Sequence, residues 1–234
     1  MKVFAHRGES ALFPENSRSA IQNCIDSEMF GVEIDLYQAE NNFVVFHDRW
    51  LTRILGIQKR VTELTSENLS QIAGRDGLPI PDLEWVINTL AKSNLMLNIE
   101  LKNIQCIDTF MGKLELFCKK YHFPVTRLLI SSFNHNYLAQ ISRIRADLKL
   151  SLLTATHPIK VENQLPEFEL YSVNLDMDCI SAELIAAYKK LNYKVMVFTV
   201  DDDAEIKWLL EQGVDGIFSN DPRQACKIIN NLGS

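Results

Sequence analysis

The sequence predicts an α/β protein, specifically a (β/α)8 TIM barrel with a short antiparallel hairpin excursion after the second strand. Short apolar segments alternate with amphipathic helical segments along the 234 residues, and this alternation implies parallel strands. Eight strand–helix units in roughly this length match a closed barrel. One additional strand-like segment follows its neighbour too closely for a parallel crossover, so it must fold back as a hairpin.

The eight parallel strands are expected where short apolar runs lie between helical patterns. These runs are Lys2–Ala5, Val32–Leu36, Leu95–Leu101, Arg127–Ser131, Lys149–Leu153, Tyr171–Leu175, Lys194–Val200 and Asp215–Ser219. Amphipathic periodicity places helices between them, and Asp82 is expected to cap the second helix. The helical segments are Asn16–Ser27, Leu83–Ala91, Ile104–Tyr121, Asn134–Arg145, Ser181–Leu191, Ala204–Gln212 and Pro222–Asn231.

The additional strand is Phe43–His47, and only a short polar segment ending in Glu40-Asn41-Asn42 separates it from the preceding strand. A turn centred near Asn41 would place His47 close to Asp35 across the hairpin. No sizeable domain is inserted between His47 and Asp82, so the mouth of the barrel is expected to be open.

Charged residues occupy inward-facing positions of two predicted strands. Because side chains alternate along a strand, Glu33 and Asp35 share one face, as do Asn98, Glu100 and Lys102. Buried carboxylates are costly unless a cation or hydrogen bonds compensate them. An all-oxygen set at converging strand ends indicates a site for one hard divalent ion, Mg²⁺ or Ca²⁺.

The alternative is a structural network in which these acids form ion pairs with Arg7 and Lys102. Without a metal ion, such a network would leave the repulsion among the carboxylates uncompensated. Histidines favour the functional interpretation, because His6 and His47 each end a strand-like run beside the carboxylates. Their near-neutral pKa suits acid and base catalysis. Beside a metal, the cations of Arg7 and Lys102 would clamp a phosphate oxygen.

Composition excludes several classes of protein. A net charge of −6 with 47% hydrophobic residues argues against a nucleic-acid partner or an anionic membrane surface. No apolar run approaches the roughly 20 residues of a membrane span, so stable membrane insertion is not expected. A histidine already at position 6 leaves no room for a signal peptide, and five scattered cysteines are typical of a reduced, cytoplasmic protein.

The motifs together resemble the glycerophosphodiester phosphodiesterase family, in the family's order and over nearly the whole chain. They are His6-Arg7-Gly8, Pro14-Glu15-Asn16-Ser17, Glu33-Ile34-Asp35, Val44-Val45-Phe46-His47-Asp48, Glu100-Leu101-Lys102, Ser132-Phe133, Gly213-Val214-Asp215-Gly216 and Asp221-Pro222. The resemblance implies a phospholipase-C-like phosphodiesterase barrel, one catalytic domain over residues 1–234. It also implies hydrolysis of small glycerophosphodiesters to sn-glycerol 3-phosphate and an alcohol.

The resemblance also implies a role for each matching residue. His6 and His47 would be the acid and the base, while the metal would be held by Glu33, Asp35 and Glu100. Phosphate would be bound by Arg7 and Lys102. Further substrate contacts are expected from Glu15, Phe133 and Phe198, the last standing where the family usually has tryptophan. The resemblance leaves open the preferred alcohol, the choice of metal and the oligomeric state. It also leaves open which histidine is the acid and whether the nucleophile is water or the glycerol hydroxyl.

Two other functions compete with this one. A related barrel phosphodiesterase could act on phospholipids or other phosphodiesters, but it would need an apolar or basic rim. A non-catalytic barrel that binds phosphodiesters would be expected to lack a metal ligand or a histidine. Two places in the sequence depart from the family pattern. Glu9 stands where a small residue is commoner, and Ser219-Asn220 stands in place of a Thr-Asp pair. Glu9 is expected to make the mouth more acidic or narrower.

Overall fold

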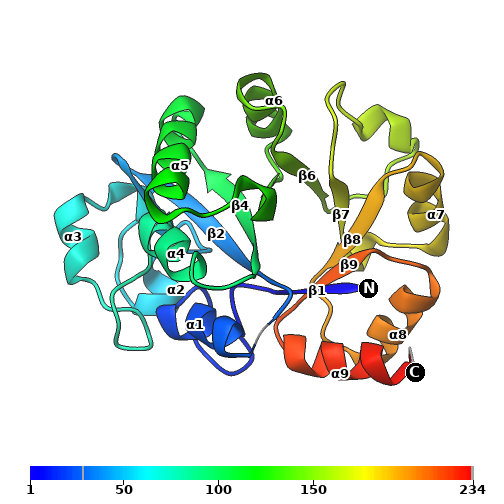
Figure 1. Ribbon diagram of the computed structural model, residues 1–234, viewed down its shortest axis with the longest axis horizontal. Coiled ribbons are helices and arrows are strands. Elements are labelled where there is room, and N and C mark those ends of the chain that lie inside the picture. Colours follow the sequence, from blue (N-terminus) through cyan, green and yellow to red (C-terminus); the bar gives the residue numbers. More distant parts are fainter. Residues whose placement is uncertain (28, 233–234) are drawn as a thin grey trace.

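The computed structural model describes residues 1–27 and 29–232. Within these residues, eight parallel strands close a ring, because β1 pairs with both its sequence neighbour β2 and the last strand, β9 (Figure 1). Around the ring the order is β1 (Lys2–Ala5), β2 (Gly31–Ala39), β4 (Met96–Asn103), β5 (Leu128–Ser132), β6 (Lys149–Thr154), β7 (Ser172–Asp176), β8 (Lys194–Phe198) and β9 (Gly216–Ser219). The predicted barrel is confirmed.

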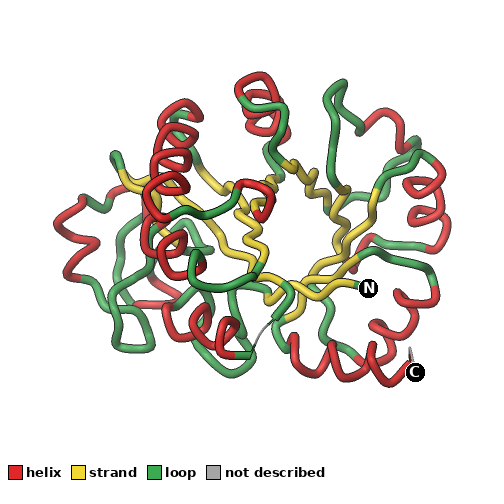
Figure 2. The backbone as a smooth tube through the Cα atoms, in the orientation of Figure 1, coloured by secondary structure: helices red, strands yellow, loops and turns green. Residues whose placement is uncertain are grey.

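Helices form a layer outside the strands (Figure 2). In chain order they are α1 (Arg18–Asp26), α4 (Leu83–Leu90), α5 (Ile107–Tyr121), α6 (His135–Ile144), α7 (Ala182–Lys190), α8 (Asp203–Glu211) and α9 (Pro222–Leu232). Asp82 caps α4 as predicted, accepting a hydrogen bond from Trp85 N. Short 3₁₀ turns also occur, namely η1 (Val61–Glu63), η2 (Val125–Arg127), η3 (Val161–Gln164) and η4 (Met177–Cys179). No membrane-crossing helix, long and apolar enough to span a bilayer, occurs in the described ranges.

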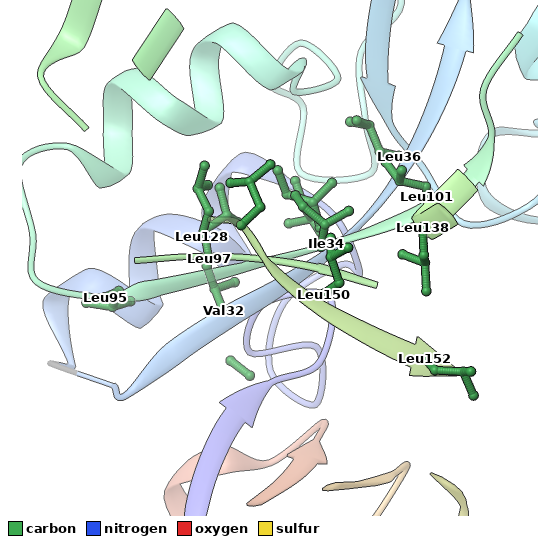
Figure 3. Close-up of a cluster of buried hydrophobic side chains, with 14 of the residues drawn as sticks. Val32, Ile34, Leu36, Leu95, Leu97, Leu101, Leu128, Leu138, Leu150 and Leu152 are labelled. Atoms are coloured by element: carbon green, nitrogen blue, oxygen red, sulfur yellow. The ribbon is translucent and has the colours of Figure 1, made fainter. Parts of the chain in front are cut away.

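Two strands show why the barrel can carry charge inside it. On β2, Val32, Ile34 and Leu36 alternate with the acidic residues and pack outward, in a cluster that also contains Leu97 and Leu101 of β4 (Figure 3). Burying such aliphatic side chains contributes about 1.5–3 kcal/mol each. The outward-facing side chains therefore stabilise the strands by packing, while the inward-facing positions can carry the polar residues of the site.

The additional strand lies outside the ring. Strand β3 (Asn42–Val45) pairs antiparallel with β2, so that Val45 lies opposite Leu36, as predicted. Strand β3 ends at Val45 rather than at His47, where the sequence predicted its end. Phe46 N still donates a hydrogen bond to Asp35 O at 3.0 Å, and the chain then turns away from β2. His47 consequently lies on the loop after the strand.

Residues 48–82 pack as a small insert beside the barrel mouth. They contain α2 (Thr52–Leu55) and α3 (Ser66–Gln71). The insert has its own apolar cluster, in which Leu51, Val61 and Leu64 pack with Phe46. It is short, as expected, yet it brings α2 to the mouth.

Candidate active site

Three buried carboxylates gather inside the barrel. Glu33, Asp35 and Glu100 are 3%, 1% and 9% exposed, and each offers a carboxylate oxygen within 4.8 Å of the others. In the β2–β4 register, Asp35 lies opposite Glu100. Sequence alternation had predicted their shared face, and the structure places them together there.

The three carboxyl groups differ in charge. Burial, and then the charges of Asp35 and Glu100, raise the pKa of Glu33. Burial and the charge of Asp35 raise the pKa of Glu100 to about 7. Burial would also raise the pKa of Asp35, but the cations of Lys102 and Arg7 outweigh it and lower that pKa. The cluster therefore contains one carboxyl group whose pKa is lowered, Asp35, and two whose pKa is raised, Glu33 and Glu100.

The cluster fits a hard divalent ion. Its donors are all carboxylate oxygens, the ligands that Mg²⁺ and Ca²⁺ prefer. Glu33 Oε1 is buried and has no hydrogen-bond partner among the described residues, and such an atom is costly unless a cation meets it.

Two cations cover these carboxylates. Lys102 Nζ lies 3.1 Å from Asp35 Oδ1 and 2.5 Å from Glu100 Oε1, on the inward face that it shares with Glu100. Arg7 Nε lies 3.3 Å from Asp35 Oδ2, and the Arg7 backbone N–H donates to Glu33 Oε2 at 2.9 Å. Both predicted phosphate-binding residues therefore contact the predicted metal ligands.

The loop after β1 turns sharply to make these contacts. Arg7 has φ 59° and Gly8 has φ 79°, in the left-handed region that glycine tolerates best. A Cβ at Gly8 would lie 2.7 Å from Ala20 Cβ on α1, so a side chain there is excluded. The turn brings Asn16 onto Asp35: its Nδ2 donates to Asp35 Oδ2 at 2.8 Å, and its Oδ1 accepts from Asp35 N at 3.2 Å.

His6 lies at the end of β1 and is held through its Nδ1 atom. Nδ1 lies 2.9 Å from Asn220 Oδ1, and Asn220 donates its amide to Asp201. Because that oxygen is an acceptor, Nδ1 carries the proton and Nε2 is free to accept one. Burial and the neighbouring charge of Arg7 lower the pKa of His6 to about 4, so the ring is neutral near pH 7.

His47 is held in the same way by its neighbour in the chain. Its Nδ1 lies 2.7 Å from Asp48 Oδ1, which leaves Nε2 for proton transfer. A charge on either His47 or His6 lowers the pKa of Asp35, so both rings lie near the acidic cluster. The hairpin prediction had placed His47 near Asp35 in this way.

Glu15 lies between the two histidine neighbourhoods. Its carboxylate accepts from Arg7 Nη1 at 2.9 Å and from Arg53 of α2 at 2.8 and 3.0 Å. It also gathers with His47 and Asp48, whose ligand atoms lie within 4.8 Å. Burial would raise the pKa of Glu15, but its hydrogen bond from Arg53 and the charge of Arg7 lower it.

The two predicted aromatic contacts lie together. Phe133 and Phe198 pack edge to face with ring centroids 5.7 Å apart, and Lys102 Nζ lies 5.9 Å from the centre of the Phe133 ring. Phe133 is exposed, so it presents an apolar surface beside the cluster.

Two cavities open beside the carboxylates. One of about 740 Å³ is lined by His6, Arg7 and Glu15, and one of about 900 Å³ is lined by His47 and Lys102. Because Arg7 and Lys102 both contact Asp35, the acidic cluster lies between the two cavities and is covered by these cations.

Glu9 does not line the mouth, so that expectation is wrong. Its side chain is 0% exposed and pairs with Arg223 Nε of α9 at 2.6 Å, while Asn23 of α1 also donates to it. The turn at Gly8 directs it away from the barrel opening and into the helix layer.

Several polar residues around the site were missed as contributors. Asn16 was expected only to open a helix, and Asp201, which accepts two hydrogen bonds from Asn220, was not singled out for the site. Asp48 stood inside a motif without a role of its own, and Arg53 carried no signal. Their contacts cross between loops, and a single sequence contains no periodic pattern for such contacts.

The chain is similar to a known protein family and to several of its relatives over nearly all its length. The model of the Glycerophosphoryl diester phosphodiesterase family matches residues 6–224. A glycerophosphodiester phosphodiesterase of Bacillus altitudinis is 30% identical, covering 97% of both chains, and one of Caldanaerobacter subterraneus is 29% identical over 99% of this chain and 98% of its own. The structure of an Oleispira antarctica phosphodiesterase in complex with the product sn-glycerol-3-phosphate superposes with a TM-score of 0.90 at 24% identity, covering 98% of this chain and 97% of that one.

Proposed function

Because this chain belongs to the glycerophosphoryl diester phosphodiesterase family, we propose that it hydrolyses glycerophosphodiesters to sn-glycerol 3-phosphate and an alcohol with one divalent ion, Mg²⁺ or Ca²⁺. The observation that carries the proposal is the trio of Glu33, Asp35 and Glu100 within 4.8 Å of one another, with a histidine on either side. The proposal treats residues 1–234 as one catalytic barrel domain.

The ion would be held by Glu33, Asp35 and Glu100. When bound, it would supply Lewis-acid polarisation of the phosphoryl group. Arg7 and Lys102 bind the non-bridging phosphate oxygens and compensate the charge that develops on phosphorus. To do so they exchange part of their contact with Asp35 for contact with the substrate.

The histidines move the protons. One histidine, neutral and with Nε2 free, removes the proton of the nucleophile, either water or the neighbouring glycerol hydroxyl. The other starts as an imidazolium, with protons on Nδ1 and Nε2, and gives its Nε2 proton to the leaving alcohol. Asn220 and Asp48 hold the Nδ1 protons, which leaves Nε2 as the reactive nitrogen of each ring. Glu15 orients Arg7, and the edge-to-face pair of Phe133 and Phe198 provides an apolar wall for the carbon skeleton of the substrate.

The direct test measures release of glycerol 3-phosphate by a coupled assay. EDTA should abolish release, and Mg²⁺ or Ca²⁺ should restore it. His6→Ala and His47→Ala should each lower turnover by about 10²–10⁴-fold with the fold intact, while His157→Ala, at an exposed position, should not. Wild-type turnover in both variants would refute the assignment.

A second substrate identifies the acid. A p-nitrophenyl ester of glycerol phosphate has a leaving group that needs no proton, so the variant lacking the general acid should recover much of its activity on it. The variant lacking the base should stay inactive on both esters. Equal losses on the two esters in both variants would contradict an acid–base pair.

A further inference from the structure

Arg53 joins the two sides of the mouth through one guanidinium. Its Nε and Nη2 donate to Asp48 at 2.6 and 2.8 Å, and its Nη1 and Nη2 donate to Glu15 at 3.0 and 2.8 Å. The side chain is 51% exposed, and an exposed arginine loses rotamer freedom when it is fixed between two partners. Four charge-assisted bonds to two carboxylates give this side chain a single geometry.

The carboxylates of Asp48 and Glu15 each form a second hydrogen bond, to a side chain that the proposed reaction uses. Asp48 Oδ1 accepts from Arg53 and is the atom that holds His47 Nδ1. Glu15 Oε1 accepts from Arg53 Nη2 and is also the atom that holds Arg7 Nη1. The contacts therefore form one unbroken chain from His47 to Arg7.

We propose that Arg53 is a positioning residue that aligns the imidazole of His47 with the guanidinium of Arg7 through Asp48 and Glu15. The inference rests on the proposed function, in which His47 transfers a proton and Arg7 binds phosphate. Without Arg53, Asp48 and Glu15 lose their common partner, and each is free to rotate away from the group it holds. The insert thus contributes to the reaction through α2, because Arg53 holds the two carboxylates that orient His47 and Arg7.

The bonding geometry predicts two separable effects. Loss of the Asp48 branch should misplace the proton-transferring ring and lower kcat by about 10- to 100-fold, the usual cost of removing a group that orients a reactive one. Loss of the Glu15 branch should misplace Arg7 and raise KM. Arg53→Gln should show both effects, and Arg53→Lys, whose ammonium cannot fork to both carboxylates, should recover only part of the activity.

The test is a pair of double-mutant cycles on glycerol 3-phosphate release. The kcat effect of Arg53→Gln should disappear in an Asp48→Asn background, and its KM effect should disappear in a Glu15→Gln background. Arg60→Gln is the matched control, because Arg60 is an exposed arginine of the same insert that stacks on Trp50; it should keep wild-type kinetics. Additive effects in both cycles, or equal kinetics for Arg53→Gln and Arg60→Gln, would overturn the proposal.

A measurement without substrate separates this inference from the proposed function. In ¹⁵N-histidine-labelled protein, the His47 ring resonances, assigned with His47→Gln, should shift in Asp48→Asn and in Arg53→Gln but not in Arg60→Gln. An inactive wild-type enzyme whose His47 resonances respond in this way would refute the proposed function and leave the positioning supported. Unchanged His47 resonances in Arg53→Gln would refute the positioning whatever the activity.

Discussion

Asn16 is the most informative residue to replace, because it ties the loop after β1 to the centre of the acidic cluster. It is buried, and its amide both donates to Asp35 Oδ2 and accepts from Asp35 N. It also has φ 54°, a left-handed conformation that alanine tolerates poorly. Asn16→Ala therefore removes two hydrogen bonds and introduces backbone strain, whereas Asn16→Gly removes the same bonds without the strain.

The magnitude follows from these two contributions. A hydrogen bond to a charged group contributes about 1.5–3 kcal/mol, and a buried backbone donor left without an acceptor costs about 1–3 kcal/mol. The left-handed backbone adds about 1–2 kcal/mol for alanine. Asn16→Ala should thus lower the free energy of unfolding by about 3.5–8 kcal/mol, and Asn16→Gly by about 1 kcal/mol less.

Urea unfolding of the metal-free protein measures both values, with the slope m as a check that the transition is unchanged. Asn192 is the matched control, since it is exposed and has φ 64°. Asn192→Ala and Asn192→Gly report the backbone contribution alone. If the Asn16 variants lost no more stability than the Asn192 variants, the amide would not be what holds Asp35, and the reasoning would fail.

Two further predictions concern the metal and the fold. Because the metal-free protein raises the pKa of Glu100 to about 7, metal must displace a proton below that pH. Apparent affinity for the ion should fall by at least about tenfold from pH 8 to pH 6, since protonation of Glu33, whose pKa is also raised, would add to the effect of Glu100. Calorimetry in two buffers should show proton release, and a flat profile would contradict the raised pKa of Glu100. Arg223→Met should lower the free energy of unfolding by about 1–3 kcal/mol because it removes the cation that pairs with the buried carboxylate of Glu9. Arg145→Met, which breaks an exposed pair, should cost less than about 1 kcal/mol, and equal losses in urea would refute the difference.

The sequence predicted the parts of the site that lie on strands. Glu33, Asp35 and Glu100 could be found because alternation along a strand fixes which face a side chain occupies. His6 was predicted for a related reason: parallel strands end at the same rim, so a residue just beyond a strand is brought to the mouth. Both rules depend on local, periodic patterns of residues, and a single sequence shows such patterns in full.

The loop contacts could not be predicted in this way. Arg53 bonds to Glu15 across 38 positions of the chain, and Asn220 bonds to His6 across 214. Such pairs depend on how each loop leaves its strand, which no periodicity encodes. Glu9 shows the consequence, because a reversal of direction at Gly8 sends it into the helix layer rather than to the mouth.

The same arrangement explains how the buried acidic cluster is compensated without a bound ion. Arg7 and Lys102 supply two positive charges to three carboxyl groups, and the raised pKa values of Glu33 and Glu100 favour a proton there. A divalent ion among the carboxylates would provide the charge that the cations and the proton otherwise supply. The cations could then turn toward an anionic ligand at lower electrostatic cost. Substrate phosphate should therefore bind tightly only after the ion, because without it Arg7 and Lys102 are needed by the carboxylates beneath them.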